Sequence, residues 1–200
     1  MTQRIKATVL ACLALALTAC FSSSPPARFF GLASMPADPG ADAPDQVSVG
    51  VGPIDVPEYL RRPQLVTRGQ GSEFIVHEYA RWAERLDSAI PRLLATNIDA
   101  LSPGVVAVAM PYTAEVGIDY RLLGRVMRFD TDAAGLAVLE IQWGLGRRGE
   151  HIGATHRSRY TATAADPEDP QAIVAALQET IDACSRDLAA AVKAEVARDP

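Results

Sequence analysis

Cysteine is scarce in this sequence of 200 residues, which contains three. Cys12 and Cys20 lie in an N-terminal segment that we expect to be processed, for reasons given below. Cys184 then remains alone, so the processed chain cannot form an intrachain disulfide. The helical pattern around Cys184 favours a small buried apolar side chain over a reactive thiol.

The sequence also lacks a surplus of positive charge and an apolar run long enough to span a membrane. The formal net charge is -5, whereas domains that bind nucleic-acid backbones carry a basic surplus, so we predict no nucleic-acid partner. A membrane-spanning helix needs about 20 apolar residues, and no segment of the sequence meets that requirement. The chain is 48% hydrophobic, which is enough to bury the core of one compact domain.

The sequence contains no nucleophile elbow, zinc-ligand spacing or phosphate-binding loop. Its histidines, His77, His151 and His156, lack helix-face ligand spacing and have no cysteine or carboxylate cluster beside them. The segment "GLGRRG" at 144–149 matches a dinucleotide-binding pattern, but a β-like segment follows where a pyrophosphate site needs a helix. We therefore predict no enzyme activity, no cofactor and no metal.

The N-terminus has the features of a secretory signal peptide. Arg4 and Lys6 form a basic region, and an apolar run follows from Ala7 to Leu17. The next residues complete "LTAC", which resembles a bacterial lipobox, in which the thiol of the cysteine is acylated and the cysteine becomes the new N-terminus. We predict that Cys20 is lipidated. Phe21 follows it instead of the aspartate that retains lipoproteins in the inner membrane, which favours the outer membrane.

These features divide the chain into three predicted parts. Residues 1–19 are a lipoprotein signal peptide, and residues 20–45 are a lipidated N-terminus and flexible tether. The tether is rich in serine and proline ("SSSPPA", then "PADPGADAP"), a composition that cannot bury a core. Residues 46–198 form a single α+β domain held at a membrane that it does not span.

The hydrophobic periodicity predicts the elements of this domain. Val47, Val49 and Val51 alternate as in a strand, and residues 63–79 suit a hairpin with a turn at "GQGS". A helical period begins at Trp82, although Pro91 either bends this helix or falls in its first turn if the helix begins near Ser88. After a short strand at 105–110, three strands form an antiparallel meander, and a long helix follows Asp169, which can cap it. We predict a mostly antiparallel sheet with two main helices on one face.

Several segments together resemble the PqiC-type lipoproteins, a family also described as the ABC-type transport auxiliary lipoprotein component. The segments are "GPIDVPEYLRRPQLVTR", "EYARWAERLDSAIPRLLATNIDAL" and "GRVMRFDTDAAGLAVLEIQWGL". The family has a lipobox, a proline-Tyr-Leu step, an Arg-Pro-Gln-hydrophobic-Val-Thr-Arg segment, a Trp-Ala pair, and a Phe-Asp turn before a strand with tryptophan. These correspond to Cys20, Pro57 with Tyr59 and Leu60, Arg62 to Arg68, Trp82 with Ala83, Phe129 with Asp130, and Trp143. The chain departs from the family at Arg85, where proline is common.

The resemblance implies a non-enzymatic lipoprotein on the periplasmic face of the outer membrane. Such proteins belong to intermembrane lipid transport systems and support membrane integrity. The expected partners are a periplasmic tunnel protein with MCE domains, which this lipoprotein would dock at the outer membrane, and an inner-membrane permease. A homo-oligomer also fits such an adaptor. An envelope hydrolase and a purely structural envelope lipoprotein remain the alternatives.

The stretch "EYLRRPQLVTR", Glu58 to Arg68, concentrates positive charge in this acidic chain. We expect its arginines to pair with carboxylates of this chain or of a neighbouring subunit. The predicted ridge is either partner-facing or structural, since aromatic side chains serve both roles. It comprises Tyr59, Arg62, Gln64, Arg68 and Trp82.

Overall fold

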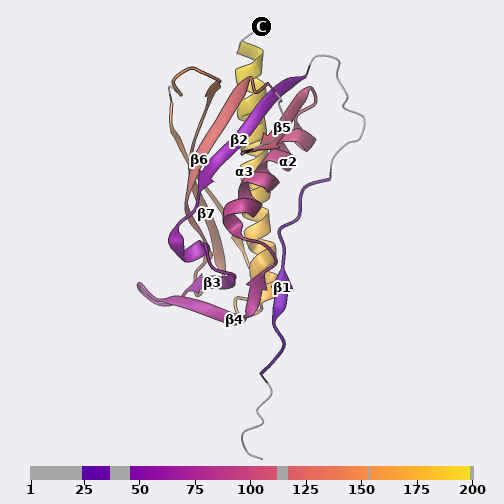
Figure 1. The fold of residues 1–200 in the computed structure, drawn as a ribbon. Helices are drawn as coiled ribbons and strands as arrows, with labels where there is room; N and C mark the ends of the chain where they lie inside the picture. Colours follow the sequence, from indigo (N-terminus) through magenta and orange to yellow (C-terminus); the bar gives the residue numbers. More distant parts are fainter. Residues whose placement is uncertain (1–23, 37–45, 112–116, 153, 199–200) are drawn as a thin grey trace, which may run out of the picture.

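The computed structural model describes residues 24–36, 46–111, 117–152 and 154–198. The predicted signal peptide and Cys20 lie outside these residues. Within them the chain forms two α-helices and eight strands in two sheets (Figure 1). The predicted α+β class is therefore confirmed.

The larger sheet has five strands in the order β5-β2-β6-β7-β8. The strands are β2 (Val47–Asp55), β5 (Val105–Ala109), β6 (Tyr120–Thr131), β7 (Leu136–Arg147) and β8 (His156–Thr163). The predicted meander is confirmed, because β6, β7 and β8 pair antiparallel. The segment "GLGRRG" covers the end of β7 and the turn after it, and the next element in the described residues is strand β8, where a dinucleotide site would need a helix.

The prediction of a mostly antiparallel sheet is wrong for β2, which pairs in parallel with both β5 and β6. Parallel neighbours require a crossover connection. Between β2 and β5 the chain builds two strands of the smaller sheet and the first long helix before it returns. Alternation of apolar residues marks a strand without indicating its direction, so the sequence pattern did not reveal this arrangement.

Both helices pack on one face of the larger sheet, as predicted (Figure 1). The first, α2 (Leu86–Leu101), contains Pro91 within it, and the second, α3 (Pro170–Arg198), begins where its cap was expected. The Gln171 N–H donates to Asp169 Oδ1 over 3.2 Å, which satisfies one of the free amides of the first turn. No helix in the described part of the chain is long and apolar enough to cross a membrane.

The smaller sheet has three strands in the order β1-β4-β3. Its antiparallel pair, β3 (Gln64–Arg68) and β4 (Phe74–Trp82), is the predicted hairpin. Gly71 lies in the connecting turn with a φ of 64°, a left-handed conformation that favours glycine. Strand β1 (Arg28–Phe30) joins β4 in parallel.

Part of the predicted flexible tether belongs to the folded domain. Phe30 of β1 and the nearby Leu32 are buried in the core. The amide of Gln178 on α3 accepts from the N–H of Ala33 over 2.8 Å and donates to its carbonyl over 2.9 Å. The N–H of Met35 donates to Asn97 Oδ1 of α2 over 2.8 Å. The short apolar segment "RFFGL" explains the difference, because it buries side chains despite the serines and prolines around it.

Asn97 is fully buried and links this segment to both helices. Its Nδ2 donates to Ser185 Oγ of α3 over 2.9 Å. We expect Asn97→Ala to lower the free energy of unfolding by about 1–3 kcal/mol, because the Met35 N–H loses its partner. Chemical denaturation measures this loss, and hydrogen exchange should accelerate at Met35. Replacement of the exposed neighbour Thr96 by alanine should change neither.

Candidate functional site

The buried carboxylate of Asp130, on β6, joins the two sheets. Its side chain is 0% exposed and accepts hydrogen bonds from three residues. Arg68 Nε of β3 lies 3.0 Å from both oxygens, and Arg128 Nε lies 2.7 Å from Oδ1. The hydroxyl of Tyr59 donates to Oδ2 over 2.8 Å. We call these four residues, Tyr59, Arg68, Arg128 and Asp130, the Asp130 cluster.

Tyr59 reaches the cluster from a single 3₁₀ turn, η1 (Glu58–Leu60), that follows Pro57. Its hydroxyl donates to Asp130 and also accepts the Phe129 N–H over 3.2 Å. Burial raises the pKa of Tyr59 to about 12. The phenol therefore stays protonated at neutral pH and keeps its role as a donor to the carboxylate.

Aromatic side chains surround the cluster. The Arg68 guanidinium lies 4.7 Å from the ring centroid of Phe74, within range of a cation–π contact. Phe74 packs in turn on Tyr59, with ring centroids 4.8 Å apart. On the core side, Trp82 stacks on Phe129 at 6.4 Å and is 6% exposed. Tyr59 and Arg68 of the Glu58–Arg68 stretch, together with Trp82 of β4, thus meet the Phe129-Asp130 pair on β6 of the larger sheet.

The predicted ridge residues divide into two groups in the structure. Tyr59, Arg68 and Trp82 lie where the two sheets meet. Arg68 pairs with Asp130 of its own chain, which is the first of the two predicted alternatives. Arg62 is exposed just before β3, and Gln64 is half-buried with its Nε2 3.4 Å from Glu78 Oε2. Sequence reasoning missed Arg128. It could have been found because it lies two residues before Asp130 in a strand, and side chains with that spacing lie on the same side.

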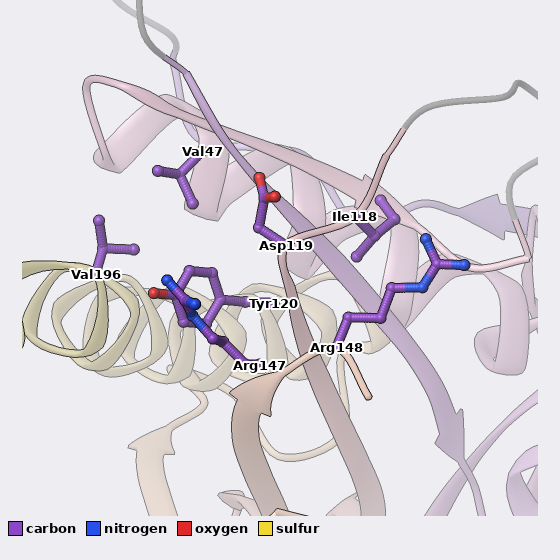
Figure 2. A pocket seen from close by; sticks show the side chains of 7 residues that line it. All are labelled: Val47, Ile118, Asp119, Tyr120, Arg147, Arg148 and Val196. Carbon is purple, nitrogen blue, oxygen red and sulfur yellow. The ribbon is translucent and has the colours of Figure 1, made fainter. Parts of the chain in front are cut away.

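A second feature is a pocket of about 470 Å³ at the end where β2 and β6 begin and α3 ends (Figure 2). We call it the distal pocket. Apolar side chains and two arginines line it: Val47, Ile118, Tyr120, Val196, Arg147 and Arg148, with Asp119 beside them. Figure 2 shows Arg147 beside the Tyr120 ring, whose centroid lies 5.9 Å from the guanidinium carbon. Sequence reasoning did not single out these residues, because they come from segments far apart in the chain.

Asp119 is fixed at the mouth of the distal pocket by Ser48. Its Oδ2 accepts the Ser48 N–H over 2.9 Å and the Ser48 hydroxyl over 2.7 Å. These hydrogen bonds lower the pKa of Asp119, so it stays a carboxylate at neutral pH. Among the described residues, no group of three or more His, Cys, Asp or Glu could hold a metal ion.

The distal pocket and the N-terminal segment lie at opposite ends of the domain. Figure 1 shows the start of β2, the start of β6 and the end of α3 at one end. Strand β1, the β3–β4 hairpin and the first described residues lie at the other. The molecule therefore has a tether end and a distal end.

Residues 30–189 match the family model of the ABC-type transport auxiliary lipoprotein component. The chain belongs to this family. The match covers the Asp130 cluster, the five-stranded sheet, the β3–β4 hairpin and most of α3, and it supports the resemblance inferred from the sequence. No curated protein is significantly similar to the sequence.

Two crystal structures share the fold of this auxiliary lipoprotein. One, of an uncharacterized protein, has 18% identity and a TM-score of 0.68, and the match covers 84% of this chain and 99% of that one. The other, a Xanthomonas campestris protein of the DUF330 family, has 20% identity and a TM-score of 0.65, with 80% and 92% covered. At these identities the likeness establishes the fold.

Proposed function

We propose that this auxiliary lipoprotein is a non-enzymatic docking subunit of an MCE-type intermembrane lipid transport system. Lipid on Cys20 would hold it at the periplasmic face of the outer membrane, where it supports membrane integrity. The distal end would receive the periplasmic tunnel protein, whose inner-membrane permease completes the system. The observation that carries the proposal is the placement of the tether and the distal pocket at opposite ends of the domain.

Chain length supports this orientation. Arg28, the first residue of β1, follows Cys20 by eight residues. An extended chain of that length spans at most about 29 Å. Because β1 is paired with β4, the tether end cannot move far from the lipid. The distal end then points away from the membrane, toward a protein that approaches through the periplasm.

The distal pocket suits a protein segment with apolar and acidic side chains. Val47, Ile118 and Val196 offer apolar contacts, while Arg147 and Arg148 are exposed at its rim. Protein interfaces combine an apolar centre with a polar rim in this way. Within this proposal, Tyr59, Arg68 and Trp82 form a structural ridge that holds the two sheets together. The exposed Arg62 and the half-buried Gln64 form its edge.

A charge reversal at Arg148 tests the docking role. We expect Arg148→Glu to reduce recovery of an MCE-domain partner by about tenfold or more, because like charges at an interface cost several kcal/mol. The measurement is a crosslinked pull-down of the lipidated protein from membranes, with partner identification by mass spectrometry. Membrane fractionation and a thermal melt should match those of the unaltered protein.

The matched control is Arg186→Glu, which reverses an exposed arginine on α3 away from the pocket. It should leave partner recovery unchanged. Equal loss in both variants would indicate a general charge effect and would reject the distal pocket. Absence of any MCE-domain partner with the unaltered protein, under conditions that preserve the envelope complex, would reject the transport proposal itself.

A further inference from the structure

Exposed apolar side chains are concentrated on the three-stranded sheet. Five large hydrophobic side chains are well exposed in the described residues, and four of them belong to β1 and β4. They are Phe29 at 66%, Phe74 at 40%, Ile75 at 43% and Tyr79 at 46%. Clustering of this kind marks a surface that is covered in the working protein, whereas single exposed apolar residues are ordinary.

Two of these side chains flank Arg81 on one side of the sheet. Phe29 is in register with Arg81 across the parallel β1–β4 pair. Tyr79 lies two residues before Arg81 on β4, and the residues that alternate with these two are buried. Phe29 and Tyr79 therefore form one surface, which we call the apolar patch. Phe74 and Ile75 lie beyond a shift in the β3–β4 register and are not part of it.

The apolar patch lies at the tether end of the domain (Figure 1). Phe29 is nine residues from Cys20, so its distance from an acyl chain is limited by the same short connection. The patch and the distal pocket are at opposite ends, so a partner bound at the pocket would leave the patch uncovered. We propose that the apolar patch contacts the lipid bilayer and seats the domain on the membrane beside its anchor.

The chemistry of the patch fits the bilayer interface. Phenylalanine gains from leaving water, and tyrosine is enriched where one end of the ring is apolar and its hydroxyl stays wet. The half-buried Arg81 beside them has a long apolar stem and a charged head, which suits contact with lipid phosphates. The inference rests on the proposed lipid anchor at Cys20 and adds a second, weaker contact that fixes orientation. Membrane attachment by two signals is the usual way to make it stable.

Site-specific labels in the lipidated full protein test the contact. Cys184 is fully buried and burial raises its pKa to about 12, so a single added cysteine can be labelled selectively. We would place an environment-sensitive fluorophore at Tyr79→Cys and reconstitute the protein in vesicles of phosphatidylethanolamine and phosphatidylglycerol. The expected result is a blue-shifted emission that a quencher attached to the lipid tails suppresses. A label at Arg186→Cys on α3 should show neither change.

Two further outcomes separate this inference from the anchor on which it rests. If the protein does not float with the vesicles, the anchor proposal fails and this inference fails with it. If it floats but lipid-borne quencher acts no more strongly at position 79 than at position 186, the anchor stands and the inference is rejected. A blue shift without lipid quenching would show that protein, such as a second copy, covers the patch, and would also reject it.

A variant tests whether the apolar side chains cause the contact. In Phe29→Ser with the label at Tyr79→Cys, we expect the protein to float as before and the lipid quenching at position 79 to fall. The paired control is Met127→Ser, which alters an exposed apolar residue on β6 of the other sheet. Unchanged quenching in the Phe29 variant would contradict a cooperative patch.

Discussion

Replacement of Asp130 by alanine should lower the free energy of unfolding by about 3–5 kcal/mol, because loss of one member of a buried charge cluster leaves its partners unpaired. Arg68 and Arg128 would both lose a carboxylate, and the Tyr59 hydroxyl would lose its acceptor. The arginine side chains are 31% and 21% exposed, so water would compensate them only in part. Urea denaturation followed by circular dichroism measures the loss.

Asp55→Ala is the matched control for this prediction. Asp55 also pairs with an arginine, Arg125, but both side chains are mostly exposed and their closest atoms are 3.4 Å apart. Exposed ion pairs contribute about 0–1 kcal/mol. A destabilisation at Asp130 no larger than that at Asp55 would show that the Asp130 cluster does not hold the sheets together.

The placement of the Asp130 cluster also shows what sequence reasoning could reach. The family signature included Tyr59, Arg68, Trp82 and Phe129 with Asp130, and the pairing of Arg68 with a carboxylate was expected. The identity of that carboxylate was not predictable, because 62 residues separate Arg68 from Asp130. Hydrophobic periodicity predicts which side of a helix or strand is buried, but it does not predict which distant elements pack against each other.

The difference between local and long-range signals also explains which helices and strands were predicted correctly. The β3–β4 hairpin, the meander and α3 depend on local signals, namely turn residues, alternation and a cap at Asp169, and all three are present. The parallel pairing of β2 with β5 and β6 depends on a crossover, and the docking of β1 depends on three residues that follow a proline-rich segment. Both are tertiary effects that override local composition.

Replacement of Cys20 by alanine should remove the protein from the outer-membrane fraction while the domain stays folded. Each buried methylene of an acyl chain contributes about 0.8 kcal/mol to membrane binding, so loss of the lipid removes the dominant attachment. Cell fractionation with immunoblotting measures localisation, and a thermal melt of the purified variant checks the fold. Cys12→Ala, in the predicted signal peptide, is the control that should keep the normal localisation.

The apolar patch should not rescue the Cys20 variant. Full burial of one large apolar side chain is worth about 1.5–3 kcal/mol, and Phe29 and Tyr79 are already partly buried in the domain. A single acyl chain of many methylenes binds membranes only marginally, so two partly buried side chains cannot retain the protein alone. Outer-membrane retention of Cys20→Ala would therefore mean that a protein partner, and neither lipid nor the patch, holds this chain at the membrane.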